Sequence, residues 1–285
     1  MENNNSNDLN ITGGYESFTE RGGFEDICST YDSYYLRYFF DGASELIDEI
    51  NNEISLDKID SLLDIGTGTG HLSLEVAKRY PNCKVVGIDN SLGMLSKAKK
   101  KKGDINNIEF FKHNWEELYS FDGKFDVVTN SFGISFIENI DKFSKSVASK
   151  VKPKGLFAFI NFDNEGFEPF ATQMLSDLQK MSLLRRLPTS LAPGNNLLIR
   201  QMEIIGFETV KYEKKKLHYT MENVEQWWTI CTRTAIKENF FYHLSDKELE
   251  EFKVEHLKNV QKLIDEGRNE YDVTVVLYMG RLKMN

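Results

Sequence analysis

The amino-acid sequence has few cysteines, and their arrangement suggests neither a disulfide framework nor a metal centre. Cys28, Cys83 and Cys231 are scattered, and no Cys-x-x-Cys pair occurs among the 285 residues. The five histidines likewise lack the short spacing that is typical of metal ligands. We therefore expect no metal, and a reducing cytoplasm is the compartment that suits this cysteine usage.

The sequence also lacks an excess of basic residues and a long apolar run. Its formal net charge is −9, so no surface that follows nucleic acid is expected. No stretch approaches the roughly 18 apolar residues of a membrane span, so no membrane partner is expected. Residues 1–9 are rich in Asn and Asp and lack the basic and apolar segments of a signal peptide. We predict a flexible tail over residues 1–24.

Short apolar runs alternate with helical patterns from residue 61 onward, which is typical of a parallel sheet covered by helices. The predicted strands are 61–65, 84–88, 107–111, 125–130, 155–161, 207–217 and 272–281, and the predicted helices include 71–80, 91–102, 139–150 and 196–205. We predict an α/β, Rossmann-like fold with a seven-stranded, mostly parallel sheet and helices on both faces.

Two segments interrupt this alternation and are rich in aromatic residues. Residues 163–195 contain one helical pattern, at 170–187, and residues 221–266 look helical throughout, with a capping box from Ser245 to Glu248. Long ordered insertions beside a ligand-binding edge are usually functional. We predict that residues 25–285 form a single domain, in which 163–195 and 221–266 are a helical cap.

A glycine-rich segment carries the main functional signal. The apolar run at 62–63 leads into Asp64, and Gly66, Gly68 and Gly70 follow at alternate positions before a helical pattern. A strand, a glycine loop and a helix in this order present backbone N–H groups to a nucleotide. Asp89, at the end of the next predicted strand, is placed to accept both ribose hydroxyls of an adenosine. The pattern predicts an S-adenosylmethionine site, whereas an NAD site normally has Gly or Ala where His71 stands.

Four motifs together resemble those of the class I S-adenosylmethionine-dependent methyltransferases. They are the glycine segment 62–70, the segment 85–95, the fourth-strand segment 125–130 and the turn 151–155. The nearest likeness is to the small-molecule branch that includes the ubiquinone/menaquinone biosynthesis methyltransferases. The resemblance covers residues 61–162 well and the last third of the chain less.

The resemblance implies which residues bind the cofactor. The implied set is Asp64, Gly66, Thr67, Gly68, Asp89, Asn90, Met94, Asn114, Trp115 and Asn130. In this family the acid of the second motif binds the ribose and the methionine packs on the adenine. Asn114 stands where the family usually has Asp, and its amide oxygen can still accept from the adenine amino group. Asp64 has two open roles: it orients the loop, or it meets the methionine amino group.

The acceptor is less defined than the cofactor. Methyltransferases that act on base amino groups often carry Asn-Pro-Pro-Tyr after the fourth strand, but this sequence has Asn-Ser-Phe-Gly at 130–133. We therefore predict a small organic acceptor, methylated at oxygen, nitrogen or carbon. A non-catalytic sensor or scaffold that binds S-adenosylmethionine, and a protein or RNA methyltransferase, stay as alternatives.

Candidate acceptor residues come from the aromatic N-terminal segment and the predicted cap. Tyr31, Tyr35, Trp228 and Arg233 are the candidates for substrate binding. The sequence identifies no catalytic residue, and His218 and Tyr35 are the candidates for a catalytic role. The cap aromatics also suit a homodimer interface, which is the rival interpretation.

Overall fold

The chain folds around one twisted sheet. The computed structural model describes residues 24, 28, 31–32, 36–137, 139–184, 195–233 and 240–284. The side chains of residues 116, 164, 165 and 233 are not described. The sheet has seven strands in the order β3-β2-β1-β4-β5-β7-β6. They are β1 (Ser61–Ile65), β2 (Lys84–Asp89), β3 (Ile108–Lys112), β4 (Phe125–Ser131), β5 (Val151–Gly166), β6 (Phe207–Thr220) and β7 (Glu270–Leu282). Only β7 runs against its neighbours. The predicted fold class is confirmed.

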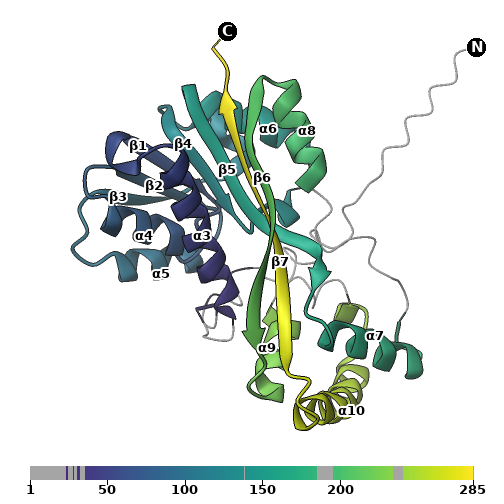
Figure 1. Cartoon of the computed structure of the whole chain (residues 1–285). Helices are drawn as coiled ribbons and strands as arrows, with labels where there is room; N and C mark the ends of the chain where they lie inside the picture. The colour runs from purple at the N-terminus through teal and green to yellow at the C-terminus, as the bar shows by residue number, and fades with distance from the viewer. Residues whose placement is uncertain are drawn as a thin grey trace, which may run out of the picture.

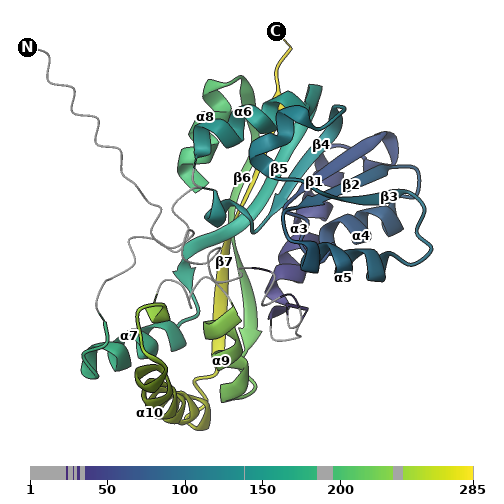
Figure 2. The same ribbon diagram turned by 180° about the vertical axis from the view of Figure 1, so that it is seen from behind.

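Helices cover both faces of the sheet (Figures 1 and 2). One face carries α3 (Tyr38–Glu53), α4 (His71–Arg79) and α5 (Leu92–Lys102), and the other carries α6 (Ile140–Lys150) and α8 (Asn195–Ile204). Short 3-10 turns lie at Leu56–Lys58, Trp115–Ser120 and Ile134–Phe136. The buried side chains accordingly form two clusters, one on each side of the strands. In α3 they recur at a spacing of three to four residues, as an amphipathic helix requires.

Helix starts follow local side-chain chemistry that the sequence displays. The Ser91 hydroxyl accepts from the Met94 N–H at the start of α5, and the Asn139 side chain accepts from the Lys142 N–H at the start of α6. Each bond satisfies one of the N–H groups that a helix start leaves without a partner. The predicted capping box at Ser245 is present and begins α10 (Asp246–Asp265).

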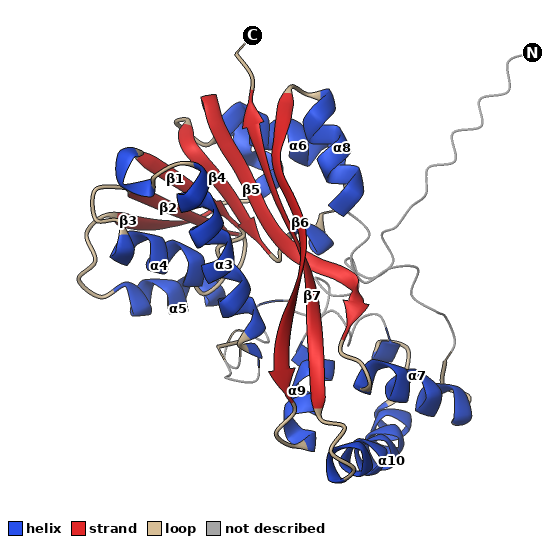
Figure 3. Cartoon of the chain, viewed as in Figure 1, coloured by secondary structure: helices blue, strands red, loops and turns tan. Residues whose placement is uncertain are grey.

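The cap lies at the far ends of β6 and β7, which run on well past the rest of the sheet (Figure 3). It contains α7 (Phe170–Lys180), α9 (Val224–Arg233) and α10. The β6–β7 pairing runs from Phe207↔Leu282 to Thr220↔Glu270, with a register shift between Thr209 and Lys211. Both strands are longer than predicted. Antiparallel pairing with β7 likewise prolongs β5 to Gly166.

Three boundaries in the cap differ from the sequence prediction. Residues 163–166 are strand and not insertion, α7 ends at Lys180, and a turn at 242–245 separates α10 from the segment before it. Residues 221–266 are therefore not helical throughout: the turn interrupts them, and α10 begins only after its N-cap residue Ser245. Residues 185–194 and 234–239 of the predicted cap lie outside the described residues, as does the predicted tail 1–24 apart from Phe24.

A buried polar chain holds the cap helices together. The Trp227 indole N–H donates to His256 Nε2 at 2.7 Å, and His256 Nδ1 lies 2.8 Å from an Asp177 carboxylate oxygen. The three side chains come from α9, α10 and α7 and are at most 2% exposed. Burial lowers the pKa of His256, against the opposing effect of Asp177. A neutral ring with its proton on Nδ1 satisfies both contacts, which explains how a histidine stands among the buried residues of α10.

Candidate active site

The glycine loop connects β1 to α4 and passes beside the end of β2. Gly66 and Gly68 have φ values of +69° and +57°, a left-handed conformation that favours glycine. The Thr67 N–H donates to the Ile88 carbonyl at 2.9 Å, which fixes the loop to β2. A Cβ atom built at Gly68 would meet nothing within 4 Å. Gly68 therefore faces open space and not the packed interior.

Asp89 lies against this loop, as the two motifs predict. One carboxylate oxygen accepts from the Gly68 N–H at 2.8 Å, and the other accepts from the Ser91 N–H at 2.8 Å. These two contacts tie the loop to the start of α5 and fix the orientation of the carboxylate. The structure thus brings the acid at the end of β2 and the glycine loop together at one edge of the sheet.

Asp64 is buried under the loop and is held by hydroxyl groups. Its carboxylate accepts from Ser73 Oγ at 2.7 Å and from Thr129 Oγ1 at 2.9 Å, and it is 1% exposed. Burial raises the pKa of Asp64 to about 6, although the hydrogen bonds from Ser73, Thr67 and Thr129 act in the opposite direction. These contacts join β1, α4 and β4, so they favour the loop-orienting role.

A cleft opens between the loop, the end of β4 and α3. Its lining residues are Tyr31, Phe39, Phe40, Ala43, Asp64, Gly66, Thr67, Gly68, Thr69, His71, Leu72, Ser131 and Phe132. No cap residue belongs to this lining within the described part of the chain. The wall opposite the loop therefore comes from α3 and Tyr31, whereas we expected the cap and the segment 31–35 to form it together.

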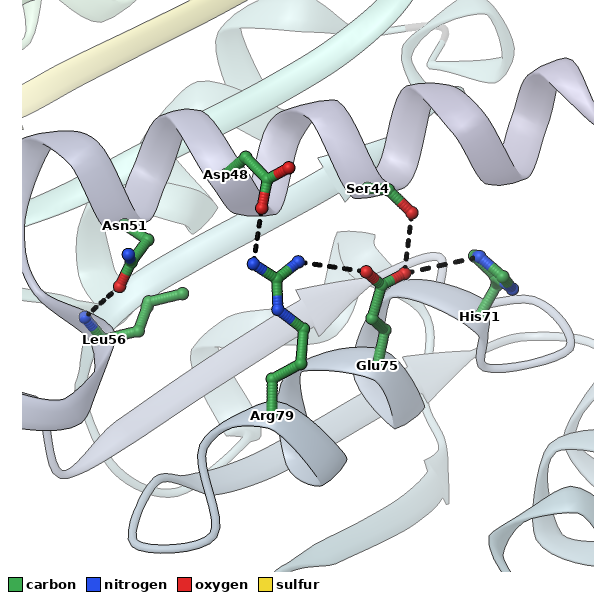
Figure 4. A network of polar contacts seen from close by, with 7 residues as sticks. All are labelled: Ser44, Asp48, Asn51, Leu56, His71, Glu75 and Arg79. Carbon is green, nitrogen blue, oxygen red and sulfur yellow. Dashed lines mark hydrogen bonds and ion pairs between the residues drawn. The ribbon is translucent and has the colours of Figure 1, made fainter.

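Polar contacts fix α3 in this position (Figure 4). Arg79 of α4 lies 2.5 Å from Asp48 and 3.1 Å from Glu75, and the Ser44 hydroxyl donates to Glu75 at 2.8 Å. The Phe40 ring also packs on the His71 ring, with centroids 4.4 Å apart. The first turns of α3 are thus held against the helix that follows the glycine loop.

The N-terminal segment reaches the same loop through Tyr31 and Asp32. Asp32 Oδ1 accepts from Thr69 Oγ1 at 2.6 Å and from the Lys101 ammonium at 3.0 Å. The Tyr31 ring stacks on Phe39 with centroids 5.4 Å apart. Burial raises the pKa of Tyr31, and the charges of Asp89 and Asp32 raise it further. Tyr31 therefore lies close to the cleft, as predicted.

The other predicted cofactor residues are distributed around the ends of β2, β3 and β4. Met94 is buried in the first turn of α5, while Asn90 is exposed just after β2. Asn114 and Trp115 follow β3, and the Trp115 ring meets Phe143 edge to face, with centroids 5.3 Å apart. Asn130 donates to the Ile65 carbonyl at 2.8 Å and accepts from the Gly133 N–H at 3.1 Å. Its amide thus connects the ends of β1 and β4.

Two described candidates, the catalytic candidate His218 and the acceptor candidate Trp228, do not line the cleft. His218 stands on the edge strand β6, with its side chain 77% exposed, and contacts Asp272 at 2.5 Å. Trp228 stacks on Phe241 inside the cap, with centroids 5.8 Å apart. The structure therefore gives neither of these two residues a position beside the glycine loop. Tyr35 and the Arg233 side chain lie outside the described residues.

Several residues of the site escaped the sequence analysis. Ser73 and Thr129 hold Asp64, Asp32 holds the loop, and Phe39 and Phe40 supply the α3 wall. The aromatic spacing of α3 was the available signal for the last two, because the face of that helix is buried. No pattern in the sequence marks Ser73 or Thr129, whose role depends on contacts across the sheet.

A comparison with known protein families shows to which family this chain belongs. A family model described as a methyltransferase domain matches residues 56–225. The chain belongs to the methyltransferase family. The matched segment of this methyltransferase chain contains the loop, Asp89 and all five strands from β1 to β5. The predicted affiliation with the methyltransferases is confirmed.

Individual relatives match parts of the chain. It is 37% identical over 109 residues to the ubiquinone/menaquinone biosynthesis C-methyltransferase of Rickettsia prowazekii. This match covers 36% of this chain and 44% of the relative. It is 26% identical over 160 residues to the malonyl-[acyl-carrier protein] O-methyltransferase of Priestia megaterium, and this match covers 56% of this chain and 57% of the relative. The chain thus spans less than half the length of the first of these curated relatives.

Solved structures share the fold at low identity. A candidate methyltransferase from Bacillus halodurans superposes with a TM-score of 0.57 at 18% identity, over 86% of this chain and all of the other. A Haemonchus contortus phosphoethanolamine N-methyltransferase, solved with phosphomonomethylethanolamine and S-adenosylhomocysteine, gives 0.54 at 16% identity, over 92% and 60%. These likenesses concern the fold alone.

The described part of the chain contains neither a membrane-spanning helix nor a metal-binding cluster. No described helix combines the length and apolarity needed to cross a membrane. Among the same residues, no group of three or more His, Cys, Asp or Glu side chains is arranged to hold a metal ion.

Proposed function

We propose that this protein transfers a methyl group from S-adenosylmethionine to a small organic acceptor, at oxygen, nitrogen or carbon. The observation that carries the proposal is the pairing of the glycine loop with the Asp89 carboxylate, whose two oxygens contact the loop and the start of α5. Membership in the methyltransferase family and the relatives that act in quinone and acyl-carrier chemistry support it.

In this proposal each edge residue has a separate task. Asp89 accepts the ribose hydroxyls, Met94 and Asn114 with Trp115 enclose the adenine, and the backbone at Gly66 and Gly68 receives the methionine part. Asp64 and Asn130 act through the loop, because their side chains already bond Ser73, Thr129 and the Ile65 carbonyl. When bound, the cofactor supplies an electrophilic methyl carbon on a sulfonium.

The chain contributes mainly position and exclusion of water. Methyl transfer is an in-line displacement, so much of the rate gain comes from aligning the two reactants. The described lining of the cleft offers aromatic faces at Tyr31, Phe39 and Phe132 beside the loop. Such faces favour a cationic sulfur and a flat acceptor and leave little room for water.

The decisive experiment measures both binding and turnover. Purified protein is titrated with S-adenosylhomocysteine by calorimetry and then incubated with S-adenosylmethionine and a panel of small oxygen, nitrogen and carbon nucleophiles. Release of S-adenosylhomocysteine that depends on one acceptor supports the enzyme. Tight cofactor binding without turnover of any acceptor would favour the sensor alternative, and turnover only with protein or RNA would favour a macromolecular methyltransferase.

Compartment and assembly are part of the same proposal. Cys28, Cys83 and Cys231 are free thiols, which suits the cytoplasm. A homodimer through the cap stays a prediction, and sedimentation of the wild-type protein tests it directly.

A further inference from the structure

A strained turn follows β4 at the edge of the cleft. Phe132 has a φ of +58°, in the left-handed region that residues with a Cβ atom rarely adopt. Lys154, Phe167 and Ser182 also have positive φ values, but none of these three lines the cleft. Backbone strain of this kind persists where surrounding contacts enforce it, and it is concentrated at functional sites. The strain at Phe132 is therefore to be explained by the cleft that this residue lines.

Contacts on several sides enforce the turn. The Phe132 N–H donates to the Ile160 carbonyl at 2.8 Å, and the Phe132 ring packs against Phe39 and Phe162, with centroids 5.0 Å and 4.6 Å away. A Cβ atom built at Gly42 would lie 2.7 Å from Phe132 Cζ, so a larger residue at this position of α3 would displace the ring. The glycine in α3 thus makes the space that the Phe132 ring occupies.

Ser131 stands between two residues whose positions are fixed. On one side Asn130 bonds the Ile65 carbonyl and the Gly133 N–H, and on the other side is the Phe132 turn. Consecutive residues of an extended strand point to opposite faces of a sheet, yet Ser131 and Phe132 both line the cleft. The left-handed turn allows both residues to face the same space, and it leaves Ser131 at a defined place in it.

The Ser131 hydroxyl is available to a ligand. Ser131 is half-buried, and no group in the described part of the chain bonds its hydroxyl. The Thr67 and Thr69 hydroxyls in the same lining already have hydrogen-bond partners, at 2.7 Å and 2.6 Å. The Tyr31 phenol is the other hydroxyl of this lining that has no partner among the described residues. Ser131 therefore presents one O–H donor and two acceptor lone pairs to the cleft.

The charge of the cleft restricts what can bind beside this hydroxyl. Among the described lining residues there is no Lys or Arg, and the carboxylate is that of Asp64. Burial lowers the pKa of His71, so this imidazole is neutral near pH 7. A carboxylate or phosphate on the acceptor would find no cation in this lining, and its desolvation would not be offset. A neutral oxygen or nitrogen needs only a neutral partner such as a serine hydroxyl.

We propose that the Ser131 hydroxyl binds the acceptor through one hydrogen bond, that the strained turn at Phe132 holds this hydroxyl in place, and that the acceptor is uncharged. Ser131 is a specificity-determining residue in this scheme and exchanges no proton with the acceptor. Phe132 and Gly42 are positioning residues, because they act through the backbone of Ser131. The inference rests on the proposed function, since it assumes that the cleft is the methyl-transfer site.

The test uses phenol and toluene, two rings of the same shape that differ in one hydroxyl, together with benzoate as the anionic probe. Dissociation constants are measured by ligand-observed NMR on protein saturated with S-adenosylhomocysteine. Wild-type protein should bind phenol about fivefold more tightly than toluene, the ratio expected for one hydrogen bond, and should not bind benzoate. Ser131→Ala should lose the preference for phenol and keep the affinity for toluene.

Four variants complete the set. Ser131→Thr keeps a hydroxyl and should keep the preference for phenol. Gly42→Ala should reduce the preference without weakening S-adenosylhomocysteine binding, because its methyl group displaces the Phe132 ring. Ser149→Ala is the matched control, since Ser149 is also half-buried but belongs to α6 on the other face of the sheet, and it should behave as wild type. Tyr31→Phe removes the other open hydroxyl of the lining and should keep the preference.

Four results would overturn the inference: an unchanged phenol-to-toluene ratio in Ser131→Ala, a ratio lost in Tyr31→Phe but kept in Ser131→Ala, benzoate binding as tight as phenol, or no binding of either neutral ring to wild type. Weaker S-adenosylhomocysteine binding in Ser131→Ala would also refute it, by assigning the hydroxyl to the cofactor. Normal cofactor binding by wild type with any of these results refutes the Ser131 assignment alone, whereas absent cofactor binding by wild type refutes the proposed function.

Discussion

Replacement of Asp89 by alanine tests the cofactor half of the proposal. The carboxylate accepts the N–H groups of Gly68 and Ser91 at 2.8 Å each, and in the proposed function it also accepts the two ribose hydroxyls. A net loss of about 2–3 kcal/mol follows from the usual worth of hydrogen bonds to a charged group. Affinity for S-adenosylhomocysteine should therefore fall about 30- to 150-fold.

Calorimetric titration measures this loss, and Asp126→Ala is the control. Asp126 also accepts a backbone N–H, from Ser61 at 3.0 Å, and pairs with Lys152 at 2.8 Å, but it lies at the opposite edge of the sheet, at the start of β4. Its loss should lower the melting temperature and leave cofactor affinity unchanged. The reasoning fails if Asp89→Ala binds within threefold of wild type, or if both variants lose affinity equally.

Three further predictions concern the loop, its outer contact and the cap. Gly68→Ala should cost only about 1 kcal/mol of folding stability, because residue 68 has a left-handed φ of +57°. It should weaken cofactor binding more than tenfold, because the new methyl group enters the space of the ligand; thermal melts measure the first effect and calorimetry the second. Asp32→Asn, which weakens the contacts with Thr69 and Lys101, should speed S-adenosylhomocysteine release in stopped-flow experiments, most clearly at low salt, and equal release rates would contradict this. His256→Ala should cost about 3 kcal/mol, since it leaves two buried polar partners unsatisfied. The pKa of His256 is lowered in the folded state, so the unfolded chain binds more protons and wild-type stability should fall as the pH drops below about 6.5. Urea denaturation gives the free energy of unfolding of wild type and of His256→Ala at each pH. The difference between the two removes the pH dependence that Asp64 contributes to both proteins, and a difference that does not change with pH would refute the prediction.

Prediction from the sequence succeeded where the signal is local. The spacing of apolar residues placed β1 to β4 and helices α4 to α6 within a few residues, because strand and helix periodicities are properties of short segments. The glycine loop and Asp89 were found for a similar reason: parallel strands end at the same edge, so two motifs that follow neighbouring strands must meet. The capping box at Ser245 is local in the same sense.

The lengths of β5, β6 and β7 depended on their partners. Residues 163–166 contain no strand signal of their own, but antiparallel pairing with β7 resumes at Gly166↔Val273 after a register shift and extends β5 to this point. The same pairing extends β6 and β7 to the cap helices, and no described cap residue lines the cleft. Trp228 and His218 were therefore predicted at a cleft from which the structure separates them.

What the sequence by itself determined is the fold class, the methyltransferase family and the edge of the sheet at which the cofactor motifs meet. The tertiary structure alone decided that α3 forms the wall of the cleft, that Ser73 and Thr129 hold Asp64, and that Ser131 lines the cleft beside a strained turn. The physical reason is distance along the chain. Thr129 lies 65 residues beyond Asp64, and side-chain contacts across such separations arise only when the whole sheet is assembled.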